Sequence, residues 1–358
     1  MSHLEQRLEN DLSKIRGRVA EQANLVVKAV RDSIHALQTG DRRLAYTTIL
    51  NDHPVNRYMR QIDRLCHSFI AVHLPSAGHL RLLSAVIRVN IELERIGDYA
   101  VTIARESVQL SAPPTGVISR ELERMAGETL LTLTQACKAF NELNAEMARS
   151  TMPLIEQMEG SLDALYGEMM SSDQHEKIKD TLAIFVVFTQ LKRVADQAKN
   201  LCEETVFAAT GQQKQAKVYK VLFIDEDNGL LSQMAEAVAR VNFPESGLYR
   251  SAGRTPARAI DEQLTDFLDK RGIKISGETT AIEKLTQQEL AEQYIIVSLH
   301  GAVESYIPNI PFHTTAVEWN LDENASEGEG SQDMDDLYRE IALRVKDLME
   351  LLRGEGAS

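Results

Sequence analysis

Two carboxylates are spaced so that they could act together. Glu94 and Asp98 lie four residues apart in a stretch with helical periodicity, which places both on one helix face, with Asn90 one turn before them. Carboxylates this close repel each other, so burying them in a bundle requires protons, arginines or a bound cation. Metal sites in helical bundles are built from such carboxylates on facing helices. A second interpretation is a solvated face beside Arg95 and Arg105.

The sequence motif that contains these carboxylates, called the repeated phrase below, occurs twice. Residues 94–106 read ERIGDYAVTIARE, and residues 192–204 read KRVADQAKNLCEE, 98 residues later. Two matching helices imply one retained structural role, and the spacing indicates an internal duplication. Close helix packing through the small residues Ala100 and Ala198 is an alternative role for the repeat.

The second copy changes the chemistry of the pair. It keeps the Asp as Asp196 but has Lys192 where the first copy has Glu94. A protonated Lys cannot bind a metal ion, and its charge replaces what a cation would supply. On a helix Lys192 and Asp196 form an i,i+4 ion pair worth a few tenths of a kcal/mol.

Composition and charge narrow the classes of function. The chain has 358 residues, 43% of them hydrophobic, enough for two or three domains with real cores. Its net charge of −14 makes nucleic acid and anionic membrane surfaces poor partners. The three cysteines form no CxxC pair, as in reducing compartments. We expect a soluble, cytoplasmic protein, because the N-terminus has no apolar signal core and the longest apolar run, 182–188, is too short to span a bilayer.

Residues 4–210 have the periodicity of a helical region. Apolar residues recur at three- and four-residue spacing, and breaks are few. We predict about six long helices, three before the Pro113–Pro114 break and three after it. With the repeated phrase, this indicates tandem three-helix bundles at residues 1–112 and 113–210, with antiparallel neighbours.

The pattern changes after residue 210. A polar linker at 211–217 precedes a domain at 218–358, in which apolar strands alternate with amphipathic helices, as in a parallel α/β sheet. The predicted strands are residues 218–225, 294–299 and 314–319, and the predicted helices are residues 231–241 and 334–352. Residues 322–336 hold seven acidic and no basic side chains, so we expect a solvated loop there.

Several segments of the helical region match a known pattern. They are residues 40–63, 74–90, 91–104, 164–170 and 191–211. Together they resemble the PhoU family of phosphate-signalling proteins, whose signature is similar to IELERIGDYAVTIA at 91–104. Asp52 and Asn56 stand at the recurrent acidic and Asn positions of the family's second helix. The resemblance covers essentially residues 1–211 and implies all-α tandem three-helix bundles.

The resemblance also implies a metal-binding face. In PhoU proteins the Glu-x-x-x-Asp pair of each repeat lies on the concave face of the bundle and can ligate clustered iron or zinc. Carried over by position, the metal ligands are Glu94 and Asp98 in repeat one and Asp196 in repeat two. We expect iron or zinc at repeat one, and an internal ion pair with Lys192 instead of metal at repeat two. His79 stands where the family has Asp, and imidazole suits zinc or iron.

A second family is indicated by the C-terminal third. The matching segments are residues 221–240, 249–255, 266–299 and 317–323. They resemble, in order, the low-molecular-weight protein tyrosine phosphatases and the related arsenate reductases. The resemblance implies a flavodoxin-like α/β domain over about residues 218–352.

The catalytic residues of that family are replaced in this chain. The reaction needs a thiolate in a Cys-x5-Arg-Ser loop, but Asp225 stands at the Cys position and Leu231 at the Arg position. Asn228 and Ser232, which support the loop, are retained. The position of the late general acid falls near residues 322–323. We expect a pseudo-phosphatase used for docking or sensing, not an enzyme.

The two resemblances together imply a regulatory adaptor of phosphate homeostasis. By resemblance its partners are a phosphate ABC transporter ATPase and a sensor histidine kinase, and it reaches the membrane only through them. We also expect a homodimer. Two alternatives stay open: a metal-dependent or Asp-dependent phosphohydrolase, and a metal-binding sensor bundle.

Overall fold

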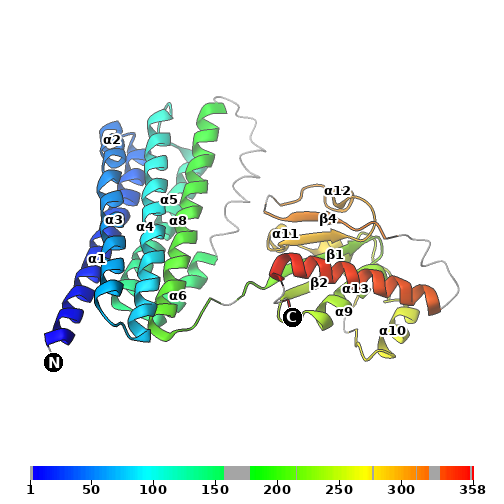
Figure 1. Ribbon diagram of the computed structural model, residues 1–358. Coiled ribbons are helices and arrows are strands. Elements are labelled where there is room, and N and C mark those ends of the chain that lie inside the picture. Colours follow the sequence, from blue (N-terminus) through cyan, green and yellow to red (C-terminus); the bar gives the residue numbers. More distant parts are fainter. Residues whose placement is uncertain are drawn as a thin grey trace. The chain divides into compact units, whose positions relative to one another are not determined.

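The chain forms two compact units, residues 1–214 and 215–358, in the computed structural model (Figure 1). The described stretches are residues 3–156, 178–214, 216–275, 278–311, 313–321, 331–354 and 357–358. The family-like segment at 164–170 and the general-acid position at 322–323 lie outside them. In the described part, no helix is both long and apolar enough to cross a membrane.

The first unit is a helical bundle, which confirms the predicted all-α class. Its described helices are α1 (His3–Thr39), α2 (Arg42–Leu50), α3 (Asp52–Val72), α4 (Ala77–Gln109), α5 (Gly116–Glu142), α6 (Ala145–Glu156) and α8 (Ile178–Thr210). Helix α4 packs against α1, α3 and α8, and α8 packs in turn against α5 and α6. Buried apolar side chains from both repeats form one continuous core. The two copies of the repeated phrase, on α4 and α8, therefore lie on neighbouring helices.

The region that resembles the family's second helix, residues 40–63, is divided between α2 and α3. The first ends at Leu50 and the second begins at Asp52, with Asn51 between them. Pro54 explains the division. It has no backbone N–H to donate, and in a continuous helix its ring would clash with the carbonyl of Leu50. In the first turn of a new helix the missing donor is not needed.

The second unit is built on a sheet of four parallel strands. The strands are β1 (Tyr219–Asp225), β2 (Gly247–Gly253), β3 (Ile295–Ser298) and β4 (Thr315–Glu318), in the order β2-β1-β3-β4. Its helices are α9 (Leu231–Asn242), α10 (Glu262–Asp269), α11 (Gln287–Ala291), α12 (Val303–Tyr306) and α13 (Ser331–Arg353), with a 3₁₀ turn, η1, at Ile282–Lys284. This order has its topological switch point between β1 and β3, as in flavodoxin-like folds. The predicted α/β class is confirmed.

Alternate residues of β1 point to opposite faces of the sheet. Val221 and Phe223 join a core with α9, α10 and α13, whereas Leu222 and Ile224 join a smaller core with α11 and α12. A strand buried on both faces reads as a continuous apolar run, and such a run predicted β1 from the sequence. The carboxyl end of β1, at Asp225, lies at the switch point, where open α/β sheets bind ligands.

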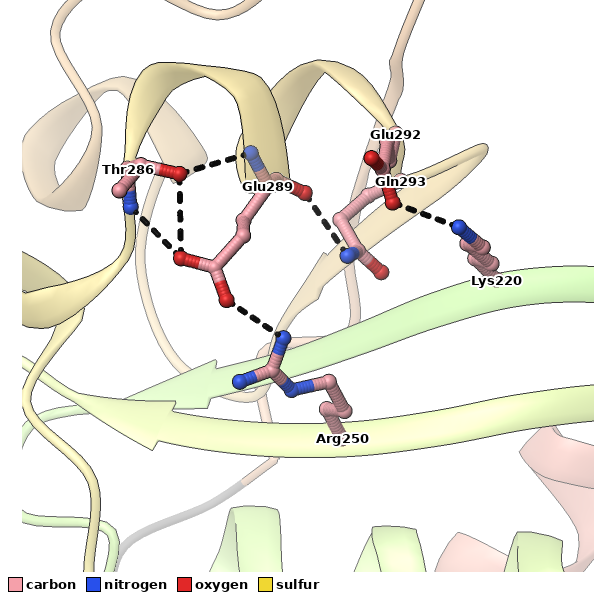
Figure 2. A network of polar contacts seen from close by, with 6 residues as sticks. All are labelled: Lys220, Arg250, Thr286, Glu289, Glu292 and Gln293. Carbon is pink, nitrogen blue, oxygen red and sulfur yellow. Dashed lines mark hydrogen bonds and ion pairs between the residues drawn. The ribbon is translucent and has the colours of Figure 1, made fainter. Parts of the chain in front are cut away.

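Strand β2 is not among the strands expected from the sequence. Its residues, GLYRSAG, include two glycines and an arginine, which weakens any strand signal. Arg250 of β2 pairs with Glu289 at 3.2 Å (Figure 2). Glu289 also accepts the backbone N–H of Thr286 in the capping box of α11. Lys220 of β1 pairs with Glu292 at 2.6 Å in the same network. These exposed ion pairs help to position α11 on the sheet, but they add little to the stability of the domain.

Candidate functional sites

The first candidate site is a hollow of about 400 Å³ where α2, α3 and α4 meet. It is lined by Ile49, Leu50, Asp52, His53, Asp98, Val101, Thr102 and Arg105. The predicted ligand Asp98 therefore lies at the hollow, and Glu94 lies one turn earlier on the same face of α4. A carboxylate from α3, Asp52, joins them.

Gly97 allows this approach of α3 to α4. A Cβ atom at position 97 would lie 3.4 Å from Oδ1 of Asp52 and 3.4 Å from Cγ1 of Val55. That is the edge of ordinary van der Waals contact, so a side chain larger than a methyl group would press α3 away. The second repeat has Ala195 at the equivalent position, 98 residues later.

Burial and neighbouring negative charge shift the pKa values of Asp52 and Glu94. Burial raises the pKa of Asp52, and the negative charge of Asp98 raises it further. Burial likewise raises the pKa of Glu94, with added repulsion from Asp98 and Asp52. Asn56 donates its Nδ2–H to Oδ2 of Asp52 at 2.5 Å, whereas the buried Oδ1 of Asp52 has no hydrogen-bond partner in the described part of the chain. The site therefore holds negative charge that is only partly compensated.

A cation is one way to compensate this charge, and the residues fit that role in part. The donors are carboxylate oxygens with the imidazole of His53 beside them, a set suited to a divalent metal. However, within the described stretches no three His, Cys, Asp or Glu side chains converge closely enough to hold one ion. Arg105 supplies some positive charge, since it lowers the pKa of Asp52. His53 was not among the site residues expected from the sequence, although it directly follows Asp52.

In the second repeat, the structure describes α8, which holds the second copy of the repeated phrase, but not residues 157–177. Lys192 and Asp196 are both half-buried on α8, and each makes contacts with other residues. The expected absence of metal at Asp196 stays a prediction.

His79 has a local structural role. It forms the capping box of α4, in which Oγ of Ser76 accepts the His79 backbone N–H at 3.3 Å and Nδ1 of His79 accepts the Ser76 N–H at 3.4 Å. Fifteen residues separate His79 from Glu94 on α4, a helical rise of about 22 Å. His79 is therefore not part of the carboxylate site.

The second candidate site is the loop between β1 and α9, which contains Asp225. Its carboxylate accepts two backbone N–H groups, from Asn228 at 2.6 Å to Oδ1 and from Ser232 at 2.8 Å to Oδ2. Asp225 is only 4% exposed. Burial raises the pKa of its carboxyl, and the hydrogen bonds from Ser232 and Asn228 oppose that shift. The carboxylate thus accepts the hydrogen bonds of the backbone amides that would otherwise bind an anion at this helix N-terminus.

The other predicted loop residues support the same arrangement. Asn228 adopts a positive φ of 51°, donates Nδ2–H to Oγ of Ser232 at 2.8 Å and accepts the backbone N–H of Thr280 at 2.7 Å. Leu231, at the first position of α9, packs against the apolar core. The exposed Asp227 accepts the N–H of Gly229 at 2.8 Å, so a third amide of the loop is also used internally.

The carbonyls of this loop are paired as well. The chain that leaves β2 donates backbone N–H groups to them, from Arg254 to Asp225 at 3.1 Å and from Thr255 to Glu226 at 2.8 Å. The backbones approach so closely that a Cβ at Gly253 would lie 2.6 Å from the nitrogen of Asn228. The loop is therefore held on both sides and has no room to rearrange without moving the end of β2.

Comparison with known proteins assigns both units. Residues 19–107 and 122–205 match the PhoU domain, and residues 220–350 match the low molecular weight phosphotyrosine protein phosphatase family. The chain is a fusion of two PhoU domains with one phosphatase-family domain. Both resemblances seen in the sequence are confirmed, and the two PhoU domains correspond to the two copies of the repeated phrase.

Three relatives that match the first unit are PhoU proteins, and each covers a similar share of this chain. The phosphate-specific transport system accessory protein PhoU homolog of Pseudomonas putida is 27% identical over 214 residues, which are 58% of this chain and 83% of the relative. The PhoU protein of Escherichia coli strain K12 is 27% identical over 214 residues, 59% of this chain and 88% of that protein. The crystal structure of PhoU from Pseudomonas aeruginosa superposes with a TM-score of 0.55 at 27% identity, covering 57% of this chain and 99% of that one.

Proposed function

We propose that this protein is a non-catalytic regulatory adaptor of phosphate transport. The single observation that supports the proposal is the pair of PhoU domains, whose similar proteins are named accessory proteins of the phosphate-specific transport system. By the same resemblance, its partners are the ATPase of a phosphate ABC transporter and a sensor histidine kinase. It acts in the cytoplasm as a homodimer and contacts the membrane through those partners.

The phosphatase-family domain contributes binding and no catalysis. A phosphatase of this family needs a thiolate nucleophile and an arginine for the phosphate dianion, and Asp225 and Leu231 stand in their places. Asp225 further supports the proposal because its two oxygens accept the amides of Asn228 and Ser232, so the anion-binding position of the loop is filled by the chain itself. Phosphate would have to displace a covalently attached carboxylate.

An Asp-dependent phosphohydrolase is the competing function, with Asp225 as nucleophile. The 4% exposure of Asp225 argues against it, because an attacking oxygen must reach the phosphorus atom. The hydrogen bonds on both oxygens argue against it as well, since they draw electron density from the attacking group and make it a weaker nucleophile. Turnover of p-nitrophenyl phosphate by the full chain separates the two functions. We expect none above background, and activity that disappears in Asp225→Ala would make this protein an enzyme.

We further propose that iron or zinc binds at repeat one, with Glu94 and Asp98 as ligands and Asp52 beside them. Two observations support this proposal. Oδ1 of Asp52 has no hydrogen-bond partner among the described residues, and the raised pKa values of Asp52 and Glu94 indicate that their negative charge is not fully compensated. A bound metal would supply that charge and stiffen the junction of α3 and α4. Asp196, the remaining family ligand in repeat two, has Lys192 beside it and needs no metal there.

The adaptor function is tested in cells and with purified partners. Deleting the gene in the source organism is expected to raise expression of a phosphate-starvation reporter when phosphate is plentiful, and the full chain is expected to restore repression. The Asp225→Ala variant should restore it as well, because the proposal assigns Asp225 no catalysis. An unchanged reporter in the deletion strain would contradict the adaptor function.

A further inference from the structure

A second hollow, of about 570 Å³, lies between α3 and α4. Its lining residues are Met59, Arg60, Asp63 and Arg64 of α3 with Ile87, Asn90 and Ile91 of α4. We call it the α3–α4 groove. It begins one turn before Glu94 on α4, and neither the metal proposal nor the pseudo-phosphatase proposal uses it.

The rim of the groove carries positive charge. Arg60 and Arg64 are exposed and lie one turn apart on α3, and neither has an ion-pair partner among the described residues. The Nε–H of Arg64 donates to the Arg60 carbonyl at 3.3 Å, which leaves the rest of its guanidinium available. The neighbouring Asp63 lies 3.5 Å from His67. In a chain with a net charge of −14, two available arginines beside each other favour an acidic partner.

The floor of the groove is apolar. Met59 and Ile87 are half-buried, and Ile91 is 38% exposed although it is an aliphatic residue on the most central helix of the bundle. An apolar floor with a charged rim is the composition of a protein-binding groove. The apolar floor would allow a bound helix to bury apolar side chains in addition to pairing its charges.

The floor also holds a buried acceptor without a donor. Asn90 is 2% exposed and donates its Nδ2–H to the carbonyl of Met59 at 2.9 Å, but its Oδ1 has no partner in the described part of the chain. Gln22 of α1 donates to the Asn90 backbone carbonyl at 3.4 Å and so does not satisfy that oxygen. An unpaired buried acceptor is costly, so the polar lining of the groove is incomplete at Asn90.

We propose that the α3–α4 groove docks an acidic amphipathic helix of a partner protein. Its carboxylates meet Arg60 and Arg64, and its apolar residues cover Ile87 and Ile91. Helix-in-groove recognition uses residues at i, i+3, i+4 and i+7, which matches charges one turn apart above an apolar floor. The proposal rests on the proposed adaptor function, because it assigns a docking site for one of that function's partners.

The test compares two charge reversals on the same helix. Arg64→Glu reverses a groove arginine, whereas Arg57→Glu makes the same charge change at an exposed α3 position that does not line the groove. Binding of the full chain to the purified transporter ATPase and sensor kinase of the source organism is measured by calorimetry, with circular dichroism as the folding control. We expect Arg64→Glu to weaken binding to one partner by about tenfold or more, because it places like charges opposite each other. Arg57→Glu should leave the affinity within about twofold, as for an exposed charge outside the contact.

A photocrosslinker identifies the occupant directly. With a benzophenone amino acid at position 91, the crosslinked partner peptide should be a helical segment rich in Asp and Glu. Equal weakening by the two reversals, or a crosslink to a second copy of this chain, would overturn the docking inference while the adaptor function stands. Displacement of the partner from the groove by inorganic phosphate would assign the site to a small anion instead. Failure of the wild-type chain to bind either partner would overturn the adaptor function and this inference together.

Discussion

The carboxylate of Asp225 accepts the backbone N–H of Ser232 at 2.8 Å, so the end of strand β1 caps the start of helix α9. The residue at the nominal N-cap position, Leu230, has no side chain that could do this. The side chain of Asp225 therefore serves as an internal ligand of the loop. The stability of the second unit can be followed by the fluorescence of Trp319. It is the only tryptophan of the chain and lies buried against Phe223 in that unit.

Replacing Asp225 should destabilise the second unit and open an anion site. Asp225→Ala leaves the amides of Asn228 and Ser232 buried without an acceptor, at a cost of about 3 kcal/mol. We expect a lower urea midpoint by Trp319 fluorescence, and a partial recovery when phosphate is added. Asp227→Ala removes an exposed acceptor and should cost less than about 1 kcal/mol. Equal midpoints for the two variants would show that the Asp225 carboxylate does not hold the loop.

Neutralising Glu94 should stabilise the metal-free bundle at neutral pH. The pKa of Glu94 is raised in the folded state, so the folded chain binds its proton more tightly than the unfolded chain does. Stability from this group is present below the unfolded pKa and is lost as the pH rises through the folded pKa. Glu94→Gln should therefore raise the melting temperature at pH 7 and have little effect near pH 4. Glu123→Gln, an exposed change on α5, is the matched control. A gain that grows on acidification would contradict the repulsion between the carboxylates.

Metal content should depend on repeat one alone. Asp98→Ala should remove iron or zinc from the purified full chain, because it deletes a carboxylate next to Asp52. Asp196→Ala should change the content little, since Lys192 provides the charge in repeat two. Elemental analysis of both variants beside the wild type decides the question. Equal loss of metal from both would refute the asymmetry.

Gly253 should not tolerate a side chain. A Cβ there would meet the nitrogen of Asn228 at 2.6 Å and the carbonyl carbon of Asp227 at 2.7 Å, and both are backbone atoms that cannot turn aside. We expect Gly253→Ala to lower the stability of the second unit by about 2 kcal/mol or more, read from Trp319 fluorescence. Gly127→Ala in α5 has open space and should raise helix stability by about 0.5–1 kcal/mol. A neutral Gly253→Ala would contradict the close approach of β2 to the loop.

The three thiols should be unreactive in the folded protein. Burial raises the pKa of Cys66, Cys137 and Cys202 to about 12 each, so almost none is a thiolate at neutral pH. Titration with a chromogenic disulfide at pH 8 should detect no fast-reacting thiol in the native chain. All three should react in denaturant. Rapid labelling of the native chain would place at least one of these residues at an accessible surface.

The helical and α/β classes could be predicted because both follow from local periodicity. The echo of ERIGDYAVTIARE at 192–204 identified the duplication, and the apolar run at 218–225 identified β1. Helix α9 was expected at 231–241 and spans Leu231–Asn242. Strand β2 was missed because its pairing with β1, and not its own glycine-containing sequence, makes it a strand.

The candidate sites were only partly readable, because they depend on contacts between distant residues. The sequence by itself determined that position 225 holds a carboxylate, and that Glu94 and Asp98 share a helix face. Only the tertiary structure decided where these charges go. It turned Asp225 inward onto the amides of Asn228 and Ser232, and it brought Asp52 against Gly97, 45 residues away. Spacing along a chain specifies neighbours within a helix, whereas the partner across a helix pair is set by packing of the whole bundle.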